Sequence, residues 1–144
     1  MADAVRIVRV EDPVDGDSEV VREGLVRFNR GVLGQTRHWP VVFHLLDEDG
    51  GFVGGLSGDV WLERLSIEFL WIEERLRGRG LGRRLVESAE AYAVGCGATH
   101  AQLDTYDFQA GRAYYERLGY EVFGVLGEAP EPVSYYMWKR LRPS

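Results

Sequence analysis

The part of the chain that most constrains its fold is a segment of alternating arginine and glycine, Arg77-Gly78-Arg79-Gly80-Leu81-Gly82. It lies between an apolar stretch that ends at Ile72 and a helical pattern that begins at Leu81. Glycines at such a junction let the backbone turn tightly and approach a ligand closely. The free N–H groups and the positive dipole end of a helix's first turn suit a phosphate or pyrophosphate. The segment therefore predicts a strand–loop–helix unit that binds an anionic group.

Two common phosphate loops do not fit this segment. The dinucleotide fingerprint G-x-G-x-x-G requires glycine at position 83, where the chain has Arg83. The nucleoside-triphosphate loop G-x-x-x-x-G-K-[ST] requires lysine after Gly82, and Arg83 and Arg84 follow instead. A plain structural turn needs one or two glycines, whereas this loop has three beside five arginines. A nucleotide-binding protein is therefore the less favoured reading.

The charge distribution points to a small anionic ligand. The formal net charge of −6 argues against broad nucleic-acid binding, which needs a basic face. One basic patch of five arginines nevertheless falls within ten residues that contain no acid: Arg75, Arg77, Arg79, Arg83 and Arg84. A solvated helix face is the alternative, but such a face normally mixes charges of both signs.

Composition restricts the compartment and the number of domains. The single cysteine, Cys96, excludes an internal disulfide. The first residues lack a signal-peptide pattern and the apolar runs are short, so we expect a cytoplasmic protein without a membrane partner. No repeat or linker interrupts the chain, which predicts a single domain over residues 4–141.

The hydrophobic periodicity predicts a mixed α+β fold. Helical spacing occupies residues 21–32, 81–93 and 109–118. Strands are expected at residues 4–10, 39–47, 52–61, 65–72, 98–106, 120–126 and 133–141. Because antiparallel strands come first and a strand–helix–strand unit follows, the sheet is expected to be mixed rather than doubly wound.

The loop also fits a third pattern, R-x-x-G-x-G, and its flanks strengthen that match. Leu70-Trp71-Ile72 precedes the loop, Phe108-Gln109-Ala110 follows the strand at 98–106, and Tyr115-Glu116-Arg117-Leu118-Gly119-Tyr120 comes next. In these segments the chain resembles the GNAT superfamily of N-acetyltransferases, and the Phe-Gln-Ala motif is similar to that of a bacterial subgroup. The resemblance extends over about residues 4–141. It implies a mixed, mostly antiparallel sheet of six or seven strands, flanked by about four helices and splayed between the fourth and fifth strands.

The resemblance further implies an acetyl-CoA-dependent N-acetyltransferase, an acyltransferase that uses acetyl-CoA as co-substrate and no metal. The pantetheine arm would pair with backbone groups of Leu70, Trp71 and Ile72. The pyrophosphate would lie on Arg77, Gly78, Arg79, Gly80, Leu81, Gly82 and Arg83. Phe108 stands where the family often has an asparagine that touches pantetheine, so Gln109 is the candidate polar contact in its place.

Tyr115 stands where many members of the family place the general acid that reprotonates the coenzyme A thiolate. A phenol can give up that proton as the thiolate leaves. A buried core aromatic is the alternative reading of Tyr115. Period-2 geometry turns Ser66 and Glu68 away from the odd apolar positions of 65–72, which are expected to face a core helix. Glu68 is therefore the first candidate for the general base, with Asp104, Glu63 or a water relay as rivals.

The acceptor is expected to be a primary amine, either small and cationic or drug-like, that attacks the thioester directly in a ternary complex. The acids that suit a cation are Glu68, Asp104 and Asp59. His38 and Trp39 are weaker candidates for shaping the acceptor pocket, and the three histidines lack metal-ligand spacing. The alternative function is a non-catalytic acyl-CoA sensor. A homodimer is a candidate assembly through three aromatic residues that we expect to be exposed: Tyr135, Tyr136 and Trp138.

Overall fold

The structure, a computed structural model, describes residues 4–142 and divides the chain into two compact units, Met1–Thr36 and Arg37–Ser144. The first unit contains one long helix, α1 (Asp15–Leu33), whose first turn carries Asp15 and Asp17. The Asp17 carboxylate accepts the Val14 N–H at 2.9 Å, and the helix stops at Gly34.

The strand predicted at residues 4–10 is absent, because these residues form neither helix nor strand. The stretch alternates apolar and charged residues, but alternation alone does not form a strand. A strand also needs a neighbour that pairs with its backbone groups, and no alternation in sequence can supply one. The prediction was therefore wrong at this segment.

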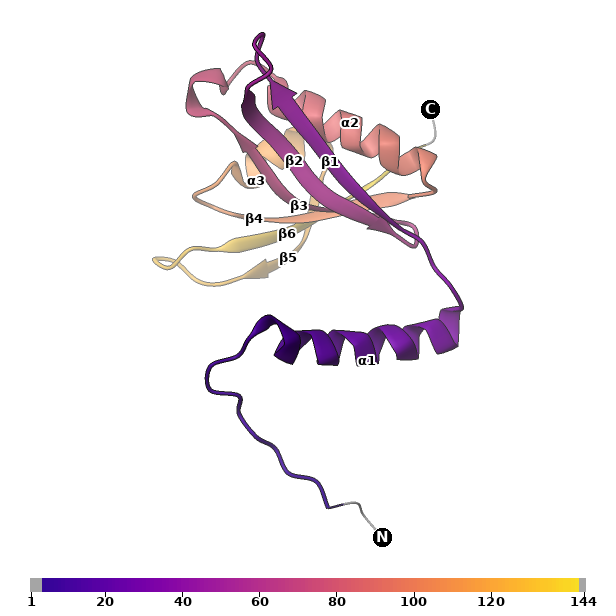
Figure 1. The fold of residues 1–144 in the computed structure, drawn as a ribbon. Coiled ribbons are helices and arrows are strands. Elements are labelled where there is room, and N and C mark those ends of the chain that lie inside the picture. The colour runs from indigo at the N-terminus through magenta and orange to yellow at the C-terminus, as the bar shows by residue number, and fades with distance from the viewer. Residues whose placement is uncertain (1–3, 143–144) are drawn as a thin grey trace. The chain divides into compact units, whose positions relative to one another are not determined.

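The second unit is built on a mixed sheet. Six strands, counted within residues 4–142, lie in the order β1-β2-β3-β4-β6-β5 (Figure 1). Their bounds are β1 (His38–Leu46), β2 (Phe52–Trp61), β3 (Arg64–Ile72), β4 (His100–Tyr106), β5 (Glu121–Leu126) and β6 (Ser134–Arg140). Only β3 and β4 pair in parallel, and every other neighbouring pair is antiparallel. The expected mixed and mostly antiparallel α+β sheet is confirmed, with six strands.

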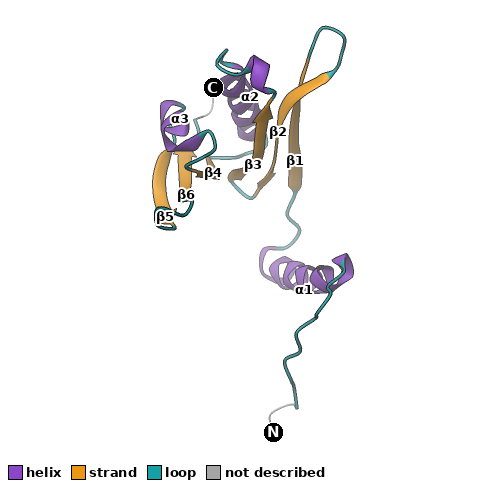
Figure 2. Ribbon diagram, turned by 90° about the vertical axis from the view of Figure 1, so that its left-hand side faces the viewer, coloured by secondary structure: helices purple, strands orange, loops and turns teal. Residues whose placement is uncertain are grey.

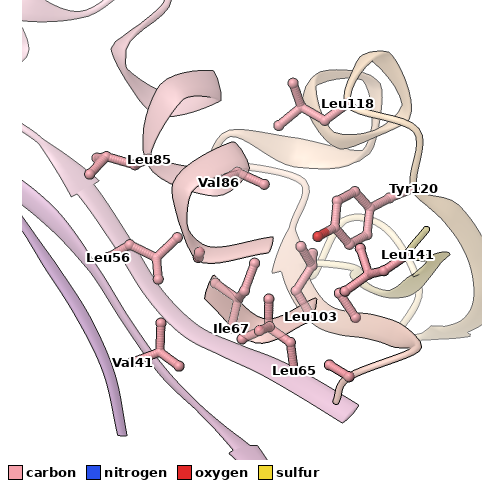
Figure 3. Packing of buried hydrophobic residues seen from close by; sticks show 14 of the residues in the cluster. Val41, Leu56, Leu65, Ile67, Leu85, Val86, Leu103, Leu118, Tyr120 and Leu141 are labelled. Carbon is pink, nitrogen blue, oxygen red and sulfur yellow. The ribbon is translucent and has the colours of Figure 1, made fainter. Parts of the chain in front are cut away.

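Two helices cover one face of this sheet. Helix α2 (Leu81–Gly95) packs on β1, β2 and β3, whereas α3 (Gly111–Arg117) packs on β4, β5 and β6 (Figure 2). Both helices contribute to a single core cluster, in which Val86 of α2 and Leu118 after α3 lie with Leu65 and Leu103 of the sheet (Figure 3). None of the helices within residues 4–142 has the length and apolar character that a membrane crossing requires.

Strand β1 shows why the sheet holds this register. Its side chains alternate between core and surface, with Val41 only 1% exposed and its neighbour Val42 58% exposed. A shift of one residue would exchange the two faces, so burial of the core face fixes the pairing.

A buried polar cluster ties α2 to the far half of the sheet. Glu90 of α2 accepts a hydrogen bond from the Tyr120 hydroxyl at 2.8 Å and another from the Lys139 ammonium at 3.0 Å. Burial, followed by the charge of Glu90, raises the pKa of Tyr120 above its usual range. A buried carboxylate is tolerated when it is paired in this way.

Strand β3 contains one extra residue, Glu68. On β2, Ser57 and Gly58 are consecutive, but they pair with Phe69 and Ile67, which leaves Glu68 without a partner on β2. This is the arrangement of a β-bulge. Gly58 faces the bulge, and a Cβ atom at that position would overlap the Ser66 carbonyl oxygen.

The bulge corrects the expected alternation of β3. Leu65 and Ile67 face the core as predicted, but Phe69 is 69% exposed and Trp71 is 50% exposed. After the bulge it is Leu70 and Ile72 that pack against the core. The prediction that all odd positions face a core helix was wrong beyond Ile67, because one additional residue reverses the alternation.

The pairing of β3 with β4 is short. It joins Arg64, Leu65 and Ser66 to His100, Ala101 and Gln102 and stops there. The Gln102 amide donates to the Ser66 hydroxyl at 3.4 Å across the last paired position. Beyond it the strands separate, which confirms the splay expected between the strands at 65–72 and 98–106.

The three aromatic residues of β6 that were expected to be exposed differ in burial. Tyr135 packs against the core cluster, Trp138 is half-buried, and Tyr136 is 36% exposed. The expectation of an exposed Tyr135 was wrong, because its side chain lies on the core face of the sheet.

Candidate functional site

A cavity of about 800 Å³ lies where β3 and β4 separate. Its walls come from the second half of β3, the loop that follows, the start of α2, the end of β4 and α3. The structure brings together nearly all the residues that the sequence singled out. These are Glu68, Leu70, Trp71, Ile72, Arg77, Gly78, Gly80, Leu81, Gly82, Arg83, Gln109 and Tyr115. Of the residues predicted to bind the donor, Arg79 alone does not line the cavity.

The loop is held by its own backbone and by Arg77. A short 3-10 helix, η1 (Glu74–Leu76), precedes it, and the Arg77 Nε donates to the Ile72 carbonyl at 2.8 Å. Gly78 and Gly80 have φ values of +76° and +78°, a region that side chains with a Cβ rarely adopt. The alternating glycines therefore allow the chain to turn from β3 directly into α2.

The N-terminus of α2 carries uncompensated positive potential. No side chain caps it, and its first turn contains no acidic residue. The first N–H groups of a helix and its dipole attract an anion, and here they lie at a cavity wall together with Arg83. The geometry fits a phosphate group better than it fits a neutral one.

Gly82 is the contact point between α2 and α3. It is buried in the first turn of α2, and a Cβ atom there would overlap the Tyr114 hydroxyl. The same Cβ would lie 3.4 Å from Cδ1 of Ile72 at the end of β3. A side chain at position 82 would therefore require the Tyr114 side chain to move, whereas the backbone conformation of Gly82 makes no such demand.

The two adjacent tyrosines of α3 lie in different environments. Tyr115 is 6% exposed, and burial together with its neighbour Tyr114 raises its pKa to about 12. Tyr114 is half-buried, and burial raises its pKa while the charges of Arg83 and Arg117 act in the opposite direction. Both rings line the cavity, and they pack edge to face with their centroids 5.1 Å apart. Tyr115 therefore keeps its proton across the neutral and mildly alkaline range.

Two of the candidate acids line the cavity and two do not. Glu68 and Asp104 are exposed residues of β3 and β4 on the cavity wall. Glu63 and Asp59 lie outside it. The Asp59 carboxylate faces Nδ1 of His38 at 3.4 Å instead.

The other candidates for an acceptor pocket also lie elsewhere. His38 stacks on Trp61 with ring centroids 5.4 Å apart, and Trp39 packs against the core. Neither His38 nor Trp39 lines the cavity. Among residues 4–142, no three His, Cys, Asp or Glu side chains gather in a way that could hold a metal ion.

The side chain of Gln109 supports a turn. Its Oε1 accepts a hydrogen bond from the Tyr106 backbone N–H at 2.9 Å. The backbone N–H of Gln109 in turn donates to the Tyr106 carbonyl at 3.1 Å. Phe108 is 68% exposed and stacks on Tyr106 with centroids 5.2 Å apart. Since Oε1 of Gln109 is engaged in this turn, its side-chain amide nitrogen is the candidate donor to a ligand.

Sequence reasoning missed three polar residues of the cavity: Thr105, Tyr114 and Arg117. Thr105 is buried, and its hydroxyl accepts the Gly111 N–H at 3.3 Å, which fixes the start of α3. Tyr114 precedes Tyr115 directly, and Arg117 follows it by two residues. Their nearness to the loop depends on how α3 packs against α2, for which the sequence carries no local signal.

The comparisons with known proteins agree with this geometry. The model of the acetyltransferase (GNAT) family matches residues 8–120, well over half of the chain. The chain belongs to this family. As a GNAT protein it is an acyltransferase that uses acetyl-CoA as its co-substrate. This membership favours an enzyme over a non-catalytic sensor.

Individual relatives support the same assignment. An acetyltransferase of Agrobacterium fabrum, Atu2258, is 30% identical over 82% of this chain and 86% of its own length. Blasticidin-S acetyltransferase of Streptomyces morookaense is 37% identical over 62% of this chain. That match spans 66% of the Streptomyces protein, just under two thirds of its length. The solved structure of an acetyltransferase from Bacillus cereus is similar with a TM-score of 0.82 and 27% identity, covering 93% of this chain and 98% of that one.

The contact at Gly82 gives a stability test. We expect Gly82→Ala to lower the free energy of unfolding by about 1–3 kcal/mol, because the new methyl group overlaps the Tyr114 hydroxyl. Tyr114→Phe removes that oxygen, so the double variant should recover most of the loss. Denaturant unfolding of the four proteins in this double-mutant cycle measures the coupling.

A matched control is Gly95→Ala at the other end of α2, where a Cβ meets nothing within 4 Å. It should unfold at a denaturant concentration equal to or above that of the unmodified protein. If Gly82→Ala is no more destabilising with Tyr114 than with Phe at position 114, the contact is not the reason for this glycine.

Proposed function

We propose that this GNAT protein transfers the acetyl group of acetyl-CoA to a primary amine by direct attack within a ternary complex. The observation that carries the proposal is that one cavity gathers the glycine–arginine loop, the end of β3, a buried tyrosine and two carboxylates. A thioester and an amine that are held side by side react as an intramolecular pair, which removes much of the entropic barrier.

The loop and the end of β3 are assigned to the donor. The N–H groups and side chains of residues 77–83 hold the pyrophosphate, aided by the uncapped start of α2. The backbone of Leu70, Trp71 and Ile72 pairs with the pantetheine arm. This assignment is supported by the ladder, since the edge of β3 that faces β4 has no strand paired to it after Ser66. The amide nitrogen of Gln109 is the remaining polar contact.

The chemical step moves two protons. The amine nitrogen attacks the thioester carbon, and backbone N–H groups of β3 stabilise the oxyanion that forms. The nitrogen loses a proton to Glu68, or to a water molecule that Glu68 holds. The carbon–sulfur bond then breaks, and the sulfur takes a proton from the Tyr115 hydroxyl. The products are an N-acetylated amine and the coenzyme A thiol, and a proton then passes through solvent from Glu68 to the Tyr115 phenolate, which restores both groups.

Tyr115 is the better placed proton donor of the two adjacent tyrosines. Tyr114 directs its hydroxyl at Gly82 in the first turn of α2, which is the end of the cavity assigned to phosphate. Tyr115 is buried, and with a pKa of about 12 it is fully protonated when the thiolate forms. The same low-dielectric cavity disfavours a free thiolate, so proton transfer accompanies the breaking of the carbon–sulfur bond.

Glu68 is the preferred base because of the bulge. As the residue of β3 without a partner on β2, it stands beside the point where the two strands separate. Asp104 lies on the other strand of the opening and is the remaining rival on the cavity wall. Glu63 is no longer a strong candidate, since it does not line the cavity.

The acceptor is assigned as a small cationic or drug-like amine. Two carboxylates, Glu68 and Asp104, flank the opening and would attract a protonated amine before it loses its proton. A relative with 37% identity is named for acetylation of blasticidin S, which supports an acceptor of this class.

The overall test is release of coenzyme A thiol from acetyl-CoA in the presence of a panel of amines. We expect release with at least one cationic primary amine, such as blasticidin S, an aminoglycoside or a polyamine. Release should be absent with the same compound after its amine has been acylated. No release with any amine, together with no binding of coenzyme A, would contradict the proposal.

Tyr115→Phe tests the acid. We expect kcat to fall by about 100-fold or more, with little change in acetyl-CoA affinity, because only the donated proton is lost. Because the pKa of Tyr115 is raised to about 12, the kcat of the unmodified enzyme should show no loss from this group up to about pH 10. Tyr92→Phe on the surface of α2 is the matched control. A Tyr115→Phe enzyme with unchanged kcat would return Tyr115 to the role of a core aromatic.

Glu68→Gln tests the base. The substitution keeps the size of the side chain and removes its ability to take a proton, so kcat should fall by about 100-fold. Glu63→Gln makes the same chemical change outside the cavity and should leave kcat near that of the unmodified enzyme. A larger loss in Asp104→Asn than in Glu68→Gln would move the base to β4.

A further inference from the structure

The sequence contains a single lysine. Of its 17 lysine and arginine residues, Lys139 is the only lysine. The two residue types differ in reactivity, because the amine of a lysine can be acylated after it loses a proton, whereas the guanidinium group of an arginine stays protonated. A chain whose co-substrate is acetyl-CoA therefore has one side-chain amine that this thioester could modify.

Lys139 lies on β6 and reaches across to α2. Its Nζ donates to Oε1 of Glu90 at 3.0 Å and lies 5.7 Å from the centre of the Tyr120 ring. The Lys139 side chain is 27% exposed, and that of Glu90 is 11% exposed. Neither Glu90 nor Lys139 lines the cavity, so the proposed reaction does not use this ion pair.

The ion pair must break before Nζ of Lys139 can react with a thioester. An ammonium ion has no free electron pair, so the nitrogen has to lose a proton and leave the Glu90 carboxylate. That step would leave a buried carboxylate with the Tyr120 hydroxyl, at 2.8 Å, as its partner among the described residues. Removing one partner of a buried ion pair is strongly destabilising. The folded chain therefore protects its one side-chain amine.

We propose that Lys139 is a protected acetylation site, which acetyl-CoA modifies only when α2 and β6 separate. The neutral Nζ attacks the thioester carbon, the carbon–sulfur bond breaks, and coenzyme A leaves as the thiol with the proton that the nitrogen gives up. The acetyl-lysine that forms has no charge and cannot form an ion pair with Glu90. Acetylation therefore removes the contact that ties α2 to β6. The proposal depends neither on the acceptor amine nor on the proposed catalytic residues.

The test is incubation of the Arg84→Lys variant with acetyl-CoA at mildly alkaline pH, followed by peptide mass mapping. Arg84 is an exposed residue of α2, so this variant supplies an exposed lysine in the same molecule. In the folded protein we expect Lys139 to be acetylated at least about tenfold more slowly than the introduced lysine. In denaturing urea the two should react at similar rates, because no ion pair remains. Equal rates in the folded protein would overturn the proposal.

Glu90→Gln tests the source of the protection. It keeps the size of the side chain and removes the charge, so acetylation of Lys139 in the folded variant should be about tenfold faster or more. Tyr120→Phe is the matched control, because it removes the other hydrogen bond to Glu90 and leaves the ion pair. Thermal unfolding shows that each variant is folded, and Glu90→Asp, which is one methylene shorter, replaces Glu90→Gln if that variant does not fold. No increase in acetylation would contradict the proposal.

Two substitutions of Lys139 test the consequence of acetylation. Lys139→Gln resembles acetyl-lysine in having an uncharged amide, and it should lower the unfolding temperature by about 5 °C or more. Lys139→Arg keeps the positive charge and should unfold close to the temperature of the unmodified protein. Equal unfolding temperatures for these two variants would show that the contact with Glu90 does not tie α2 to β6.

Discussion

The separation of β3 and β4 is the constraint on which the rest of the structure depends. Three residue pairs join the two strands, and the ladder then ends at Ser66 and Gln102. A sheet that stayed paired would bury these edges and leave no room for the cavity of about 800 Å³. The cost of unpaired backbone groups is the physical reason for expecting a ligand with its own donors and acceptors in the opening.

The sequence predicted those parts of this arrangement that depend on local chemistry. The loop at 77–82, the helix that follows it and the positions of the later strands along the chain all follow from glycine positions and hydrophobic spacing. Three features could not be predicted in this way: the lack of a strand at residues 4–10, the exposure of Phe69 and Trp71, and the nearness of Tyr114 and Arg117 to the loop. Each of these depends on pairing or packing between distant segments, and a single inserted residue such as Glu68 is sufficient to reverse a strand's two faces.

The charges at the cavity are divided between its walls. Arginines and the uncapped end of α2 make the helix side positive, whereas Glu68 and Asp104 on the two separating strands are negative. An anionic donor and a cationic acceptor would be drawn to different walls, with the buried Tyr115 as a neutral proton donor on α3. A chain with a net charge of −6 therefore keeps its positive potential where a phosphate requires it.

The short ladder between β3 and β4 also divides the sheet into two halves. Each half has three strands, β1-β2-β3 and β4-β6-β5, and long antiparallel ladders join the strands within it. Three residue pairs join the two halves at one end of the cavity. Helix α2 packs mainly on the first half and α3 on the second. The angle between the two halves of the sheet therefore sets the distance between the two helices, and with it the width of the cavity.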